Sequence, residues 1–171
     1  MISIKRIFIV GHMGAGKFLL AEALAKKLGW QLVDANPGLE RYIGRNLNEI
    51  LGKQGEEAFH QCEAEIISHY IDKEHVVVVL EEAVVASEGN RKLLSSEFVV
   101  YAKVSTKVQI ERWKAVPGRI PLLPIGDLKE FLDKQHFERD ALYEEIAKLT
   151  IDTSATVNVE DDVTKIVKKL S

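Results

Sequence analysis

The 171-residue sequence lacks several features that mark particular classes of protein. It has a single cysteine, Cys62, which excludes an internal disulfide framework and fits a reducing compartment. Its apolar runs, such as Val76 to Leu80, are far shorter than the roughly 20 residues of a membrane span. Met1 to Val10 lacks the long apolar region of a secretory signal. These absences predict a cytoplasmic protein that does not enter membranes.

The charge balance argues against nucleic acid as a binding partner. There are 23 Lys and Arg residues against 26 Asp and Glu residues, a formal net charge of −3. No basic stripe interleaved with aromatic residues is present, so we expect no nucleic-acid binding. The hydrophobic content of 46% is ordinary for a globular protein. The length favours one domain over residues 1–171, as a monomer or weak oligomer.

Short β-branched segments alternate with longer amphipathic segments along the chain. The pattern predicts strands at residues 4–10, 31–34, 75–80, 98–104 and 149–152. It predicts helices at residues 17–28, 46–51, 56–71, 89–95, 107–114, 127–148 and 161–170. This alternation is typical of an α/β fold with a mainly parallel sheet, in which ligands bind at the carboxyl ends of the strands.

The turn after the first strand, Gly11 to Lys17, matches the phosphate-loop pattern G-x-x-x-x-G-K. Glycine allows the backbone to form a nest of N–H groups, and the lysine adds a positive charge near the outer phosphates. The alternative is a tight strand-to-helix turn with a solvated lysine. The candidate nucleotide-binding residues of this loop are Gly11, Gly14, Ala15, Gly16 and Lys17.

The next position departs from the phosphate-loop pattern. A Ser or Thr hydroxyl normally holds Mg²⁺ there, but this chain has Phe18, followed by Leu19 and Leu20. Phenylalanine cannot ligate a metal, although its ring could narrow the nest or lie against a nucleotide base. The sequence therefore predicts phosphate binding by the loop backbone and Lys17, and a weakened Mg²⁺-assisted phosphoryl transfer.

Several further motifs follow in order. They are Leu28-Gly29, Asp34-Ala35-Asn36, Gly55-Glu56, Phe59-His60 and Glu63, then Arg119-Ile120-Pro121-Leu122-Leu123 and Arg139 through Ala147. With the glycine loop, they resemble the shikimate kinases, a branch of the nucleoside-monophosphate-kinase-like P-loop proteins. The resemblance implies a three-layer fold with a five-stranded parallel sheet, order 2-3-1-4-5, helices on both faces and a lid loop near residues 114–126.

The resemblance also implies an activity: transfer of the ATP γ-phosphate to the 3-hydroxyl of shikimate, with Mg²⁺. Lys17, Asp34 and Arg119 would form the catalytic set, with Asp34 supporting the metal and Arg119 reaching the transferred phosphate. Arg112 would lie on the nucleotide side, and Arg139 would hold the shikimate carboxylate. The alternatives are a helix N-cap for Asp34, a solvated loop side chain for Arg119 and helix-surface positions for both other arginines.

On the acceptor side, Glu63 matches a pocket carboxylate, but three other positions differ from the family pattern. Asn36 replaces an aspartate and cannot act as a base. His60 replaces an arginine and cannot form the two-pronged contact of a guanidinium with a carboxylate. Leu80-Glu81-Glu82 replaces a glycine triplet, so side chains are expected to fill the pocket floor and two carboxylates to repel an anionic acid.

Two hypotheses follow from these residues. One is a small-molecule kinase, either a weakened shikimate kinase or one with a different alcohol acceptor. The other is a non-catalytic module that binds a nucleotide or a partner. The five histidines show no metal-ligand spacing and are interpreted as surface or loop residues, and Cys62 as a buried thiol.

Overall fold

A central parallel sheet organises the molecule. The computed structural model describes residues 4–36, 47–115 and 125–170. Its strands are β1 (Arg6–Val10), β2 (Gln31–Ala35), β3 (Val76–Leu80), β4 (Val99–Lys103) and β5 (Leu149–Asp152). They pair in the order β2-β3-β1-β4-β5, and every pair is parallel. The predicted sheet order is confirmed.

Successive residues of the strands pack against opposite layers of helices because side chains alternate across a sheet. Ile7 and Ile9 of β1 join one core cluster, whereas Phe8 and Val10 join the other. The cluster around Ile7 is covered by α1 (Lys17–Leu28) and α7 (Val159–Leu170). Both faces of the strand are therefore buried, which explains why its sequence is continuously apolar.

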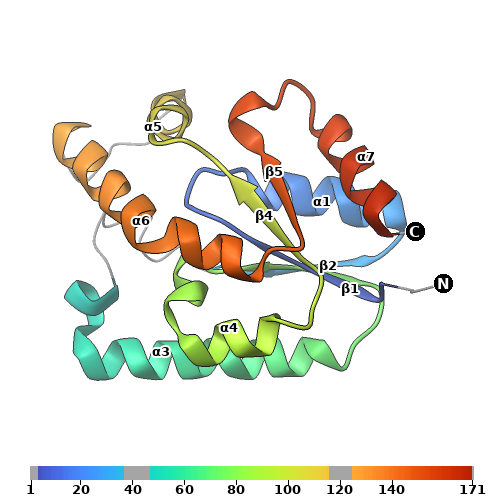
Figure 1. Cartoon of the computed structure of the whole chain (residues 1–171), viewed down its shortest axis with the longest axis horizontal. Helices are drawn as coiled ribbons and strands as arrows, with labels where there is room; N and C mark the ends of the chain where they lie inside the picture. Colours follow the sequence, from blue (N-terminus) through green and yellow to red (C-terminus); the bar gives the residue numbers. More distant parts are fainter. Residues whose placement is uncertain (1–3, 37–46, 116–124, 171) are drawn as a thin grey trace.

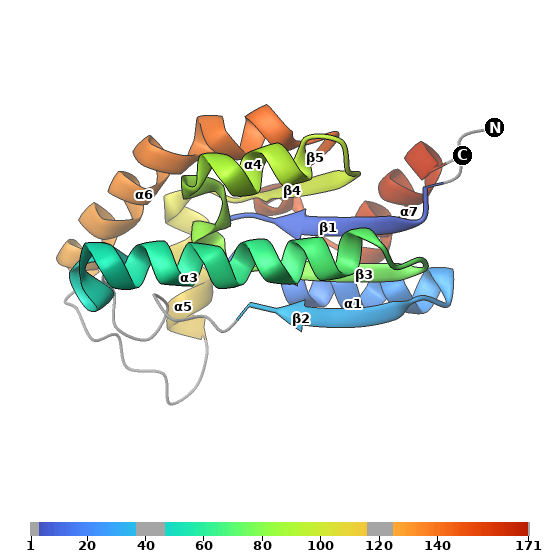
Figure 2. The same ribbon diagram turned by 90° about the horizontal axis from the view of Figure 1, so that it is seen from below.

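The opposite face is covered by α3 (Leu47–Ile71), α4 (Glu88–Leu94) and the carboxyl-terminal part of α6 (Ile125–Ile146). Figures 1 and 2 show α3 and α4 side by side on this face, away from α1 and α7. α5 (Thr106–Ala115) packs against α6. The two helices share a small apolar cluster with Met13 of the phosphate loop, which places them beside the carboxyl edge of the sheet.

Three local features differ from the expectations. The predicted break at Gly52 is confirmed, since its φ of 72° and ψ of 171° interrupt the helical segment 47–71, whereas Gly55 lies inside the second helical part instead of at the boundary. Short 3-10 helices, η1 (Glu82–Ala86) and η2 (Thr153–Ala155), follow β3 and β5. Cys62 is exposed, so the expectation of a buried thiol is wrong. Within the described ranges, no helix combines the length and apolar character needed to cross a bilayer.

Candidate functional site at the carboxyl edge of the sheet

The turn from β1 to α1 has the backbone of a phosphate nest. Gly11, Gly14 and Gly16 all have positive φ, which glycine adopts at little cost. A Cβ on Gly11 would lie only 2.4 Å from the carbonyl oxygen of Ala102 in the neighbouring strand β4. The sequence therefore needs glycine at this position both for its φ and for the close approach of two strands.

Lys17 folds back into this turn. Its ammonium donates to the carbonyl oxygens of Gly11 at 2.7 Å and His12 at 3.1 Å. It also lies 3.3 Å from Oε1 of Glu82, at the start of η1. Both side chains are almost fully buried, with 3% exposed for each. The positive charge expected for the outer phosphates is thus already paired with a carboxylate of the protein.

The two glutamates after β3 have specific partners. Glu81 accepts a hydrogen bond from the backbone N–H of Glu82 and so caps η1. Glu82 accepts a long hydrogen bond from the amide of Asn36 at 3.4 Å, and its backbone carbonyl accepts from the hydroxyl of Tyr143 at 2.6 Å. Both glutamates are buried, as expected for side chains that fill this space. The charge of Glu82, however, faces the ammonium of Lys17, a pairing that the sequence analysis did not foresee.

A cavity of about 580 Å³ opens beside the nest. The described residues around it are 13–19 of the loop and the start of α1, Asp34 near the end of β2, Asn36 just after it, and side chains from α5 and α6. Phe18 and Leu19 line it and are 43% and 64% exposed, so the Phe18 ring is not buried within the loop. The volume suits a small-molecule ligand, and the apolar mouth suits a flat aromatic group.

Arg112 connects the phosphate loop to the turn that follows β5. Its guanidinium donates to the carbonyl oxygen of Gly14 at 2.8 Å and to that of Thr153 at 2.5 Å. It also lines the cavity. The structure thus places Arg112 beside the loop, where it supports the backbone of the nest.

A metal that enters with a nucleotide needs oxygen ligands. Position 18 offers none, because phenylalanine has no polar atom. Of the described residues that line the cavity, Asp34 is the one with a carboxylate. Its Oδ1 accepts from the backbone N–H of Asn36 at 3.0 Å, and the side chain is exposed to the cavity. Mg²⁺ is commonly held by one or two carboxylates together with phosphates and water, so Asp34 fits a reduced site.

His60 and Glu63 form a pair on α3. Nδ1 of His60 lies 2.6 Å from Oε1 of Glu63, and this hydrogen bond raises the pKa of His60 above its usual value although partial burial opposes the shift. His60 is therefore charged over a wider pH range than an ordinary histidine. Neither side chain belongs to the described lining of the phosphate-loop cavity. His60 instead lines a shallow depression with Ser87 and Asn90.

The two remaining predicted arginines have different outcomes. Arg139 on α6 is buried beside His12 and Glu82, near the loop. This burial excludes the alternative of a helix-surface charge. Arg119 lies outside the described residues, as does most of the expected lid at residues 114–126, since residues 116–124 are not described.

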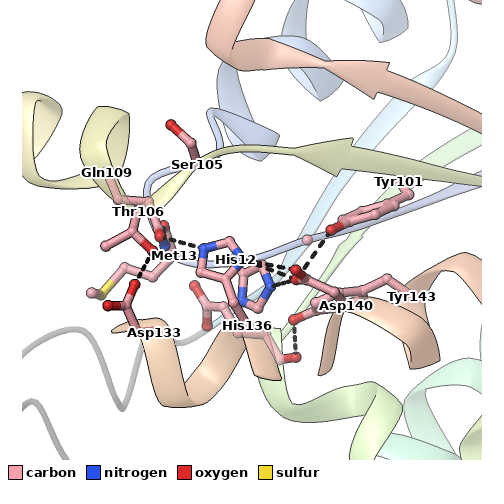
Figure 3. Close-up of polar contacts among 12 residues, drawn as sticks. His12, Met13, Tyr101, Ser105, Thr106, Gln109, Asp133, His136, Asp140 and Tyr143 are labelled. Carbon is pink, nitrogen blue, oxygen red and sulfur yellow. Dashed lines mark hydrogen bonds and ion pairs between the residues drawn. The ribbon is translucent and has the colours of Figure 1, made fainter. Parts of the chain in front are cut away.

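The sequence analysis missed a polar cluster behind the loop, drawn in Figure 3. His12 lies in the loop, as one of the two interpretations had it, but it is only 2% exposed, so it is not a surface residue. Its Nε2 lies 2.5 Å from Oδ1 of Asp140, which also contacts Nδ1 of His136 at 2.9 Å. The spacing of His136 and Asp140, four residues apart on one helix, was the one local signal for this cluster.

Comparisons with known proteins agree with this fold. The shikimate kinase family model matches residues 13–171. The shikimate kinase of Francisella tularensis subsp. holarctica is 34% identical over 173 residues, covering 100% of this chain and 95% of that protein. The Acinetobacter baumannii shikimate kinase, solved with shikimate, superposes with a TM-score of 0.76 at 28% identity, covering 98% and 93% of the two chains.

A second solved structure, the shikimate kinase of Bacteroides thetaiotaomicron, has a TM-score of 0.80 at 22% identity, covering 97% of this chain and 98% of that one. This likeness concerns the fold. The family match and the full-length relatives go further, and the chain belongs to the shikimate kinase family.

Proposed function

We propose that this protein binds ATP in the phosphate-loop cavity and phosphorylates shikimate poorly. The glycine nest, α1 behind it and the cavity beside Phe18 support nucleotide binding. The family to which the chain belongs consists of kinases that use ATP, typically with Mg²⁺. The triphosphate would lie along the loop, and the base would contact the exposed apolar surface of Phe18 and Leu19.

The proposal of poor shikimate phosphorylation rests on the contact between Lys17 and Glu82. Phosphoryl transfer depends mainly on positive charge placed around the transferred group. In this chain the carboxylate of Glu82 lies 3.3 Å from the ammonium that should supply this charge. An incoming phosphate must either displace this carboxylate or share the ammonium with it. Both outcomes weaken binding of the phosphate and reduce stabilisation of the transition state.

Mg²⁺ would be held by Asp34 together with phosphate oxygens and water. Its chemistry would be neutralisation of the phosphate charge. Without a hydroxyl at position 18 the protein supplies fewer ligands, and the loss of one could cost several kcal/mol of transition-state stabilisation, on the order expected for Lewis-acid catalysis. Arg119, with the lid near residues 114–126, and Arg139 belong to the same proposal, as the groups that would reach the transferred phosphate and the acid of the acceptor.

Two measurements test the proposal. Isothermal titration with a non-hydrolysable ATP analogue should detect binding that changes little when Mg²⁺ is added, and Lys17→Ala should abolish this binding. A coupled assay with ATP, Mg²⁺ and shikimate should give a kcat at least a hundredfold below the median of about 10 s⁻¹ for enzymes. A kcat near that median would refute the catalytic half, whereas no analogue binding would refute the nucleotide half.

A second candidate is a kinase for a different alcohol. Asn36 and Glu82 contact each other at the acceptor side, and a carboxylate there favours a neutral or cationic acceptor over an acid. ATP consumption should then rise with polyols or amino alcohols and not with shikimate. Phosphorus NMR of the product would identify the phosphorylated hydroxyl, and hydrolysis to ADP without a new phosphate ester would exclude this candidate.

A further inference from the structure

His12, His136 and Asp140 form a compact group of ligand atoms behind the phosphate loop. One nitrogen from each histidine and one carboxylate oxygen of Asp140 all lie within 4.8 Å of one another. His136 and Asp140 are on the same face of α6, four residues apart, and His12 comes from the loop after β1. Figure 3 shows the two imidazole rings converging on the carboxylate of Asp140. The group therefore joins two elements that are distant in sequence.

The hydrogen bonds of Gln109 define the proton positions on His136. The amide nitrogen of Gln109 donates to the backbone carbonyl of Met13 at 2.6 Å, which turns its Oε1 toward Nε2 of His136 at 2.8 Å. Since an amide oxygen only accepts, Nε2 must carry a proton. Metal-bound histidines commonly donate their second ring N–H to a carbonyl or carboxylate oxygen in this manner.

The other ring nitrogen then faces a carboxylate. Nδ1 of His136 lies 2.9 Å and 3.1 Å from the two oxygens of Asp140, which accept hydrogen bonds but do not donate them. A neutral His136 with its proton on Nε2 would turn a lone pair toward this negative group. A positive charge between Nδ1 of His136 and the carboxylate of Asp140 would remove this repulsion. The charge could be a second proton on His136 or a cation bound by Nδ1 and Asp140 together.

His12 is the third ligand candidate. It is buried, with 2% exposed, and its Nε2 lies 2.5 Å from Oδ1 of Asp140, so a metal bound there would replace the proton between the two atoms. A neutral imidazole is the form that binds metals. The rings of His136 and Tyr143 pack against it at centroid distances of 4.0 Å and 4.9 Å, which hold its orientation.

We propose that His12, His136 and Asp140 bind a divalent transition-metal cation of the Zn²⁺ type. Two imidazoles and a carboxylate are ligands that Zn²⁺ favours, whereas Mg²⁺ prefers oxygen alone. Tetrahedral bonds of about 2.1 Å place ligand atoms roughly 3.4 Å apart, so the side chains need to separate slightly from their present contacts. Asp140 is 39% exposed, which leaves a route for the ion and for a water as fourth ligand.

A metal ion at this site would connect two parts of the structure that are distant in sequence. His12 belongs to the phosphate loop, and α6 carries Arg139 next to Asp140. A bound ion would cross-link the loop to the helix that carries this arginine. The inference does not depend on the proposed function, because metal binding can be measured without nucleotide or acceptor.

Titration of the full chain with Zn²⁺, followed by calorimetry, and with Co²⁺, followed by its visible absorption, tests the inference. We expect one site of micromolar or tighter affinity, a tetrahedral Co²⁺ spectrum and a higher melting temperature with Zn²⁺. His136→Gln should weaken binding at least a hundredfold and remove the thermal shift. His69→Gln is the matched control, because His69 is an exposed histidine on α3, and it should leave both unchanged.

Asp140→Asn is a second variant, at a partly exposed position. It is used if circular dichroism shows that His136→Gln is not folded. It should also weaken Zn²⁺ binding at least tenfold. Equal affinities in the wild type and in a folded His136→Gln or Asp140→Asn variant would overturn the inference. If His69→Gln lost as much Zn²⁺ affinity as His136→Gln and Asp140→Asn, the inference would also be overturned, since exposed histidines would then account for the binding.

Discussion

Replacing Glu82 by glutamine tests how strongly this carboxylate opposes nucleotide binding. The substitution keeps the shape of the side chain and removes its charge beside Lys17, which lies 3.3 Å away. A phosphate oxygen on the same ammonium would lie about 6 Å from the carboxylate, where two unit charges repel by about 3 kcal/mol at an effective dielectric of about 20. Because rearrangement of the side chain relieves part of this, we expect ATP to bind ten- to a hundredfold more tightly to Glu82→Gln.

The same substitution should lower stability. Removing one partner of a buried ion pair leaves the other charge uncompensated, which typically costs about 3–5 kcal/mol. Urea unfolding would measure this cost, and calorimetry with an ATP analogue would measure the affinity. Glu82→Gln should lower the free energy of unfolding but raise the affinity for ATP. A general loss of structure would lower both, so it cannot produce the expected result.

Glu97→Gln is the matched control. Glu97 is also a largely buried glutamate in an ion pair, with Arg6 at the other end of the sheet. This variant should lose stability without any gain in ATP affinity. If Glu82→Gln binds ATP no better than the wild type, the carboxylate does not compete with phosphate, and the reasoning for poor catalysis fails at its main step.

Three other perturbations have defined outcomes. Phe18→Thr should make nucleotide binding Mg²⁺-dependent, measured by thermal shift with and without the metal; an unchanged shift would mean that the ion is placed by other groups. Gly11→Ala should destabilise the fold by about 3 kcal/mol and abolish ATP binding, because its Cβ would lie 2.4 Å from the Ala102 carbonyl oxygen; a normal urea midpoint would contradict this. The Glu63 contact raises the pKa of His60, so its stabilisation is complete below pH 6.5 and is lost as pH rises through the folded-state pKa. The difference in melting temperature between the wild type and His60→Gln should therefore shrink above neutral pH, and a difference that grew would contradict the assignment.

The sheet was predictable because its signals are local. Val76 to Leu80 is continuously apolar since both faces of β3 are covered, and Gly29 ends α1 in the left-handed conformation that favours glycine. The helix boundary at Gly55 was not predictable in this way. The predicted break occurs at Gly52 alone, where φ is 72°, and the chain then resumes the helix, so Gly55 is tolerated inside it.

The candidate site was only partly predictable, because its decisive contacts join distant positions. Lys17 and the loop glycines are contiguous and could be recognised from spacing. The contact between Lys17 and Glu82 joins positions 65 residues apart in the sequence, and the contact between His12 and Asp140 joins positions 128 residues apart. No periodicity of the sequence encodes such contacts, since they depend on where β3 ends and on how α6 packs beside the loop.

Two of the positions that differ from the family pattern, Asn36 and Glu82, contact each other. Asn36 donates to Glu82, and Glu82 lies beside Lys17. An aspartate at position 36 would place a second carboxylate oxygen about 3.4 Å from the first, where like charges in a buried site repel strongly. An asparagine at position 36 is therefore compatible with the glutamate at position 82, because its amide donates to the carboxylate instead of repelling it.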